Sequence, residues 1–339
     1  MVQIDNAVLP KGSLILVTGA NGFVASHVID QLLELGYKVR GAARSQAKLE
    51  KYQKRWDGKY PGQFEFVEVP DILKNGAYDE AIKGTDGVAH VASNVSFSPK
   101  FDEVVGDAVQ GTLNALRAAA KTPSVKRFVL TSSIVAVGSG QNGEGEILGQ
   151  KDFNRDSIEK ARGLPDDAPQ KGGLVYAASK TSGELEAWKF VEENKPSFVL
   201  NVVNPAFCAG ESLVGEAEST AGMLQGLFIS KSDSTMSFSP TLSIVPVADI
   251  ARLHIGGLLL PDVKEQRLIA APHPVNWVDV LDIYRKLYPN KKFYDNPENA
   301  PKAVRSYDSE PALKVLKQLG RDDWVPLEEA LKKTVEAVA

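Results

Sequence analysis

The chain has 339 residues, of which 43% are hydrophobic and 24% are charged, and its formal net charge is −4. This composition is that of a globular protein, and the interspersed acidic and basic residues argue against nucleic acid as a partner. The apolar runs are too short to span a bilayer, and a single cysteine, Cys208, excludes an intrachain disulfide framework. The first residues lack the apolar core of a signal peptide. We therefore expect a cytoplasmic protein with no membrane partner.

Short apolar runs, which predict buried strands, alternate with segments of helical periodicity. Strands are predicted over residues 13–19, 37–43, 64–69, 87–93, 127–133, 197–205 and 267–271. Helices are predicted over 23–35, 76–83, 102–121, 175–194 and 247–260, with two or three more within 272–339. Because this alternation is typical of a parallel sheet covered by helices on both faces, we predict a Rossmann-type doubly wound α/β fold with about seven strands.

Two long polar stretches, 138–173 and 209–243, interrupt this alternation. Long connections of this kind are usually binding loops or disordered segments. Both follow predicted strands, so we expect them at the carboxyl edge of the sheet, where open α/β sheets bind ligands. We predict a dinucleotide-binding domain of residues 1–205 plus 244–271. A smaller, mostly helical substrate-binding domain would comprise 206–243 plus 272–339.

A glycine-rich turn joins the first predicted strand to the first predicted helix. It contains Gly19, Gly22 and Ala25 in a G-x-x-G-x-x-A pattern. Gly19 permits a tight turn, Gly22 lets the backbone approach a pyrophosphate, and Ala25 is small where the helix packs closely on the strand. The N-terminus of a helix also attracts an anion. This pattern in this context predicts a dinucleotide site.

The residues after the second predicted strand indicate which dinucleotide binds. NAD sites usually carry a carboxylate there, which holds the ribose hydroxyls. Here Ala43 stands near that position, Arg44 follows it, and Lys48 lies one helical turn further on. An arginine pairs well with the 2′-phosphate of NADP. We therefore predict NADPH/NADP as the cofactor, with a solvated basic face as the alternative reading of Arg44 and Lys48.

Tyr176 and Lys180 are the candidate catalytic pair. Their i, i+4 spacing places them on one face of a predicted helix. A nearby ammonium lowers the pKa of a phenol, so Tyr176 can exchange a proton with a substrate oxygen. Ser132 and Ser133, at the end of the fifth predicted strand, carry hydroxyls that can orient that oxygen. Together with the nucleotide turn, this set indicates proton transfer at a substrate oxygen beside a bound dinucleotide.

Several segments resemble the extended short-chain dehydrogenase/reductase family. They are "TGANGFVASH", "TSS", "YAASK" and the pair Asn204–Pro205. The likeness spans nearly the whole chain and is nearest to the branch of dihydroflavonol and cinnamoyl-CoA reductases, and within it to NADPH-dependent aldehyde or carbonyl reductases. The resemblance implies that Tyr176 is the proton donor, that Lys180 lowers its pKa and binds the nicotinamide ribose, and that Ser133 holds the substrate carbonyl.

The resemblance and the turn together imply a set of residues that contact the cofactor. Asp71 and Ile72 would flank the adenine, while Pro205 and Ala206 would approach the nicotinamide. The full set is Gly19, Asn21, Gly22, Phe23, Val24, Arg44, Lys48, Asp71, Ile72, Ala92, Ser93, Thr131, Ser132, Tyr176, Lys180, Pro205 and Ala206. Many family members add an asparagine that completes a proton relay, but the aligned position here is Ala108, so the relay stays open.

The substrate pocket is less clearly marked. Phe97 and Leu174 are candidates for its wall, beside Ser133 and Tyr176, with core packing as the alternative for the first two. The pocket-forming stretches hold few charged residues, so a neutral or aromatic carbonyl, keto esters included, is expected. The four histidines show no metal-ligand spacing. Relatives include monomers and dimers, so we expect a monomer or a homodimer.

Two other functions stay open. The first is an epimerase or dehydratase that acts on a nucleotide sugar with tightly held NAD; the missing carboxylate after the second strand disfavours it. The second is a non-catalytic module that senses NADP, which the intact pair of Tyr176 and Lys180 disfavours.

Overall fold

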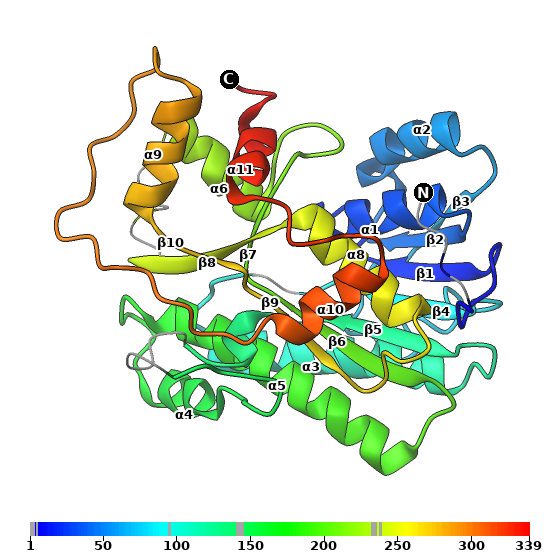
Figure 1. Ribbon diagram of the computed structural model, residues 1–339. Coiled ribbons are helices and arrows are strands. Elements are labelled where there is room, and N and C mark those ends of the chain that lie inside the picture. Colours follow the sequence, from blue (N-terminus) through cyan, green and yellow to red (C-terminus); the bar gives the residue numbers. More distant parts are fainter. Residues whose placement is uncertain (1–3, 5, 94–95, 140–145, 232–235, 237–238) are drawn as a thin grey trace.

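The computed structural model describes residues 4, 6–93, 96–139, 146–231, 236 and 239–339 (Figure 1). Its centre is a parallel sheet of seven strands in the order β3-β2-β1-β4-β5-β6-β9. These strands are Leu14–Thr18 (β1), Lys38–Ala43 (β2), Phe64–Glu68 (β3), Gly87–His90 (β4), Arg127–Thr131 (β5), Val199–Pro205 (β6) and Arg267–Ala270 (β9). The predicted doubly wound α/β fold is confirmed, and the strand ends differ from the predicted ones by a few residues.

Helices cover both faces of this sheet because its strands bury side chains on both sides. In β1, Ile15 and Val17 belong to one apolar cluster and Leu16 to the opposite one. The first cluster is completed by α1 (Phe23–Glu34), α2 (Glu50–Lys59), α8 (Val247–Leu259) and α10 (Glu310–Gln318). The second is completed by α3 (Phe101–Ala120) and α5 (Lys171–Asn194). The order of the strands reverses between β1 and β4, which is where ligands of such sheets bind.

A smaller lobe lies beyond the carboxyl edge of the large sheet (Figure 1). Its three-stranded sheet has the order β10-β8-β7. The strands are Phe207–Ala209 (β7), Thr241–Pro246 (β8) and His273–Asn276 (β10), and the helices are α6 (Ser219–Phe228), α9 (Trp277–Leu287) and α11 (Leu327–Val335). Phe228, Trp277 and Tyr284 centre its apolar cluster. The sequence does not predict these strands, because they are short and lie in polar or proline-containing segments.

The predicted division into two domains stays a prediction. The lobe does draw on both segments assigned to the smaller domain. However, α10, which belongs to the second of these segments, packs on α8 through Val315, whose methyl lies where a Cβ on Gly256 would stand. Within the two long connections, residues 140–145, 232–235 and 237–238 lie outside the described residues.

Three helical segments differ from the prediction. The helix predicted over 76–83 is a series of hydrogen-bonded turns, flanked by Gly76 and Gly84 at φ +75° and +74°. Left-handed glycines at both ends stop a regular helix, and Tyr78 and Ile82 still reach the core. Conversely, α2 and α4 (Arg155–Gly163) are not predicted, because both are strongly polar. Among the described helices, none is long and apolar enough to cross a membrane.

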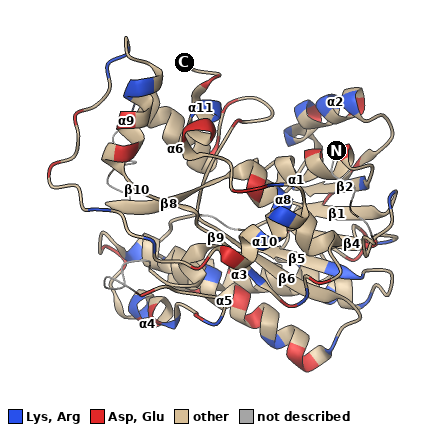
Figure 2. Ribbon diagram, in the orientation of Figure 1, with Lys and Arg blue, Asp and Glu red and all other residues tan. Residues whose placement is uncertain are grey.

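Charged residues of both signs lie on the outer helices, such as α2 and α9 (Figure 2). In α2, Lys54 pairs with Glu50 at 2.8 Å, and in α11 Lys333 pairs with Glu329 at 2.8 Å. Exposed pairs of this kind contribute little to stability. The fold therefore depends on the apolar clusters on the two faces of the large sheet and in the lobe.

Candidate active site

A cavity of about 1080 Å³ lies at the carboxyl ends of the large sheet and extends to the small lobe. It brings together residues from the glycine turn, from the ends of the strands of the large sheet and from α5. The predicted site residues that line it are Gly19, Asn21, Gly22, Phe23, Val24, Arg44, Asp71, Ile72, Ala92, Ser93, Phe97, Thr131, Ser132, Ser133, Tyr176, Lys180, Pro205 and Ala206. Lys48 and Leu174 are not among the described residues that line it.

The glycine turn has the geometry of an anion site. Gly19 has φ +68°, and a Cβ there would lie 3.0 Å from the Ala92 Cα atom, so both its conformation and its surroundings require glycine. The Gly22 N–H donates to the Gly19 carbonyl at 2.8 Å and closes the turn. Helix α1 then begins without a side-chain cap, so the first-turn N–H groups can be satisfied by a ligand. Ala25 is fully buried against the sheet.

The two predicted phosphate ligands lie in different places. Arg44 follows the end of β2, is exposed and lines the cavity. Lys48 ends a short 3₁₀ helix, Gln46–Lys48, instead of standing one α-helical turn beyond Arg44. Lys48 is not among the described residues that line the cavity. The structure therefore fits a phosphate ligand at Arg44 better than at Lys48.

The segment predicted to flank adenine is held by a buried asparagine. Asp71 and Ile72 line the cavity, and the Asp71 carboxylate accepts from the Leu73 N–H at 2.9 Å. Asn114 on α3 donates to the carbonyls of Ile72 and Lys74 at 2.9 and 3.0 Å. These bonds use both protons of the Asn114 amide, so Asn114 holds the backbone of this segment in place.

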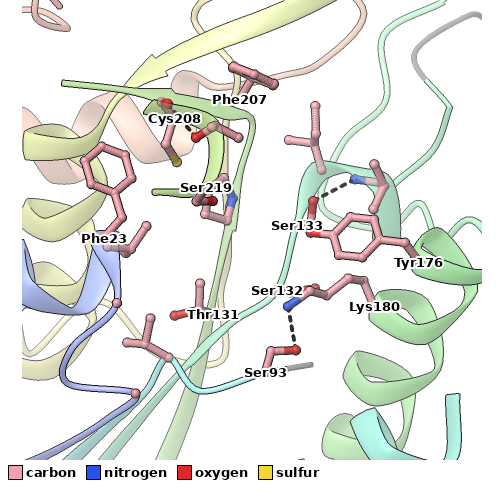
Figure 3. A pocket seen from close by; sticks show the side chains of 18 of the residues that line it. Phe23, Ser93, Thr131, Ser132, Ser133, Tyr176, Lys180, Phe207, Cys208 and Ser219 are labelled. Atoms are coloured by element: carbon pink, nitrogen blue, oxygen red, sulfur yellow. Dashed lines mark hydrogen bonds between the residues drawn. The ribbon is translucent and has the colours of Figure 1, made fainter. Parts of the chain in front are cut away.

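Tyr176 and Lys180 meet Ser93 and Ser133 at one wall of the cavity (Figure 3). The Lys180 ammonium donates to the Ser93 hydroxyl at 3.0 Å and lies 6.0 Å from the centre of the Tyr176 ring. The Ser133 hydroxyl lies beside the phenol, and their hydrogen bond lowers the pKa of Tyr176. Two residues of α5 and the ends of β4 and β5 thus converge as the spacing predicts.

Burial controls the protonation of this pair. It lowers the pKa of Lys180 to about 8, and the Glu184 carboxylate opposes this effect. It also raises the pKa of Tyr176, which the bond from Ser133 only partly offsets, and Cys208 adds to the rise. The pKa of Tyr176 is therefore raised overall in this structure, because desolvation of the phenolate is the largest effect, and its lowering by Lys180 stays a prediction.

The substrate end of the cavity is walled by the small lobe as well as by Phe97. The Phe97 ring is half-exposed and its centre lies 5.1 Å from that of Tyr176. Leu174 instead packs against the apolar cluster of Val104 and Val175, the alternative left open by the sequence. The lobe residues that line the cavity include Phe207, Cys208, Thr220, Met223, Leu242 and Ser243. Four of these residues, Phe207, Cys208, Leu242 and Ser243, lie on β7 and β8, which the sequence does not predict.

Cys208, a free and buried cysteine, lines the cavity. Its Sγ lies 3.5 Å from the Ala206 carbonyl, and burial raises its pKa to about 12. A thiol that stays protonated is a weak nucleophile, so Cys208 acts as a small packing residue.

Residues 15–224 match the NAD dependent epimerase/dehydratase family. The chain belongs to this family. It is 53% identical to aldehyde reductase 2 of Sporidiobolus salmonicolor over 338 residues, 99% of this chain and 98% of that protein. It is 36% identical to the NAD-dependent epimerase/dehydratase terH of Aspergillus terreus, over 99% of this chain and all of that one. These matches confirm the resemblance to extended short-chain dehydrogenase/reductases.

Solved structures of the epimerase/dehydratase family share this architecture. The complex of Gre2 with NADPH from Candida albicans superposes with a TM-score of 0.82 and 25% identity, covering 96% of this chain and 98% of that one. The likeness includes the small lobe, since nearly the whole of both chains is matched.

Proposed function

We propose that this protein reduces aldehydes and ketones, keto esters included, to alcohols with NADPH. The observation that carries this proposal is the convergence of Ser133, Tyr176 and Lys180 on a cavity that also reaches the glycine turn and Arg44. The 53% identity to an aldehyde reductase and the likeness to an NADPH complex support it.

The cavity residues fit this cofactor. The turn from Gly19 to Val24 would hold the pyrophosphate and Arg44 the 2′-phosphate, while Ala92, Thr131 and Pro205 would line the path toward the nicotinamide. Asn21, Phe23, Asp71, Ile72, Ser93, Ser132 and Ala206 complete the set. NADPH, when bound, supplies the hydride that the carbonyl carbon accepts.

The chain's own residues supply the proton. The Ser133 hydroxyl holds the carbonyl oxygen, and Tyr176 donates its phenolic proton to that oxygen. A raised phenol pKa keeps the proton on Tyr176 until the oxygen becomes basic. The Lys180 ammonium stabilises the phenolate that remains, and its neighbour Ser93 fixes its position.

The lobe defines the substrate class. Phe207, Met223 and Leu242 form an apolar wall, and the Phe97 ring lies tilted beside the reacting phenol. Such a wall favours neutral and aromatic carbonyl compounds. These apolar residues offer little to the charged diphosphate of a nucleotide sugar, although Arg305 also lines the cavity. The missing carboxylate after β2 also disfavours the epimerase alternative. A cytosolic monomer or homodimer is consistent with the composition.

The test is the loss of reduced-nicotinamide absorbance with aromatic aldehydes, keto esters and simple ketones, with NADPH beside NADH. We expect faster oxidation of NADPH than of NADH. Tyr176→Phe, which removes the proton donor and little else, is expected to lose turnover at least about a hundredfold while binding NADPH as the wild type does. Turnover retained in Tyr176→Phe would remove this residue from the mechanism. Binding without oxidation across the panel would favour the sensing module.

A further inference from the structure

A buried carboxylate behind the catalytic pair links the segments that carry the site. Glu184 lies on α5, one helical turn beyond Lys180, and its side chain is fully buried. Its Oε2 accepts from the Ser132 hydroxyl at 2.6 Å and from the Asn204 amide at 2.8 Å. Its Oε1 pairs with Arg267 and accepts from the Trp188 indole at 3.4 Å. Such complete pairing is what a buried charge requires.

Two of these contacts, with Ser132 and Asn204, lead to residues that the reaction uses. Ser132 immediately precedes Ser133, and the Asn204 amide also donates to the Ser133 carbonyl at 3.2 Å. The Glu184 carboxylate therefore holds the backbone of Ser133 through two neighbours. Asn204 also precedes Pro205, at the nicotinamide end of the cavity.

Arg267 holds the Glu184 carboxylate from the edge strand of the large sheet. It lies on β9, and its guanidinium also donates to the carbonyls of Gln150 and Asp152. Its centre lies 3.8 Å from that of the Phe153 ring. The connection that precedes α4 is thereby fixed to the same buried pair.

Glu184 also acts on the charge of Lys180. Burial lowers the pKa of Lys180, and Glu184 raises it. The other groups near this ammonium are Tyr176 on the same helix and His90 on β4, which burial keeps neutral with a pKa of about 3. Asp107 lines the same cavity from α3. Glu184 is the charged group with the largest opposing effect on Lys180.

We propose that Glu184 is a positioning residue for carbonyl reduction, which holds Ser133 through Ser132 and Asn204 and keeps the Lys180 ammonium charged. The proposal rests on the proposed function. It assigns to Glu184 no contact with substrate or cofactor.

Glu184→Gln tests the proposal, because it keeps the size of the side chain and removes its charge. The reduction rate of the wild type is expected to fall above about pH 8, as Lys180 loses its proton. In Glu184→Gln this alkaline limb of kcat/KM is expected to move to lower pH by about one unit, and kcat to fall about tenfold or more. The dissociation constant of NADPH is expected to change less than about threefold.

Two variants separate this role from general destabilisation. Asp249→Asn also removes a buried carboxylate, one that pairs with Arg321 at 3.5 Å and is not among the described cavity-lining residues. It is expected to lower stability without moving the alkaline limb. Glu184→Asp keeps the charge but shortens the side chain. It is therefore expected to lower kcat and to leave the pH of the alkaline fall in kcat/KM unchanged. If Glu184→Gln does not fold, an unchanged kcat in folded Glu184→Asp overturns the proposal.

The titration of Lys180 supplies a readout that needs no turnover. It is followed by NMR in protein with isotope-labelled lysine, and its signal is assigned by its loss in Lys180→Met. The Lys180 pKa is expected to be lower in Glu184→Gln than in the wild type. The proposal is overturned if Glu184→Gln has the same alkaline limb of kcat/KM and the same Lys180 pKa as the wild type. If the wild type fails to oxidise NADPH with every carbonyl compound of the panel, the proposed function is refuted. The NMR titration would still decide whether Glu184 raises the pKa of Lys180.

Discussion

At the scale of single residues, surroundings decide what each side chain can do. Tyr176 and Lys180 have the spacing of a proton-transfer pair, yet burial shifts their pKa values in opposite directions, up for the phenol and down for the ammonium. Arg44 and Lys48 are both cations after β2, but only Arg44 is among the described residues that line the cavity. Residue type and spacing name the candidates, and position selects among them.

The two cations lead to a prediction about cofactor choice. Arg44→Ser is expected to weaken NADPH binding about tenfold to a hundredfold and NADH binding very little, because a charged hydrogen bond to the 2′-phosphate is lost. Lys48→Ser is the matched control and is expected to have a small effect on either. Fluorescence titration with both cofactors measures this. An equal loss in Lys48→Ser would return Lys48 to the phosphate site.

At the scale of elements, the unit of β1, the glycine turn and α1 is built for close approach. Gly19 turns the chain in a left-handed conformation where the backbone of Ala92 leaves no room for a side chain. Gly36, just after α1, is also left-handed, with φ +86°, but has nothing within 4 Å of a Cβ. The two glycines therefore share the conformational requirement and differ in the steric one.

Alanine at these two positions separates the two requirements. Gly36→Ala is expected to lower the free energy of unfolding by about 1 kcal/mol, the cost of a left-handed alanine, with NADPH binding retained. Gly19→Ala is expected to lower it by at least about 2 kcal/mol and to weaken NADPH binding, because the turn must also move away from Ala92. Denaturant unfolding and cofactor titration measure both quantities. Equal losses at the two positions would show that the close approach is unimportant.

At the scale of the whole molecule, buried histidines link elements that are far apart in the chain. His90 on β4 hydrogen-bonds the Thr18 hydroxyl on β1 at 3.0 Å. His254 on α8 lies 2.7 Å from the Thr131 hydroxyl on β5 and 2.8 Å from the Ile250 carbonyl. Burial lowers the pKa of His90 to about 3 and that of His254 to about 4. Both are thus neutral in the folded protein at neutral pH.

This predicts a loss of stability in mild acid. The unfolded chain binds protons at these histidines below about pH 6.5, while the folded chain does not until its own lower pKa values are reached. The contribution of these neutral histidines to the free energy of unfolding is therefore complete above about pH 6.5, and it is lost as the pH falls toward their folded-state pKa values. Each histidine adds up to about 1.4 kcal/mol per pH unit to this fall.

Urea unfolding between about pH 7.5 and about pH 4.5 measures the slope. His254→Gln, which keeps a polar side chain but does not titrate, is expected to reduce the slope by the share of one histidine. A slope identical to that of the wild type would contradict the prediction.

Features that depend on neighbours in the chain could be predicted from the amino-acid sequence. The seven strands of the large sheet, the turn from Gly19 to Ala25, the cation in place of an acid after β2, and the shared helix face of Tyr176 and Lys180 all follow from local periodicity or spacing. Each is encoded within one or two elements, where burial pattern and backbone geometry repeat regularly.

Features that depend on residues far apart in the chain could not be predicted in this way and became apparent in the folded structure. The small sheet that walls the cavity joins segments around 208, 244 and 275, and the buried pair of Glu184 and Arg267 spans 83 positions. The directions of the pKa shifts and the separate positions of Lys48 and Leu174 belong here too. Burial and long-range pairing arise from packing of whole elements against one another, and no local spacing records them.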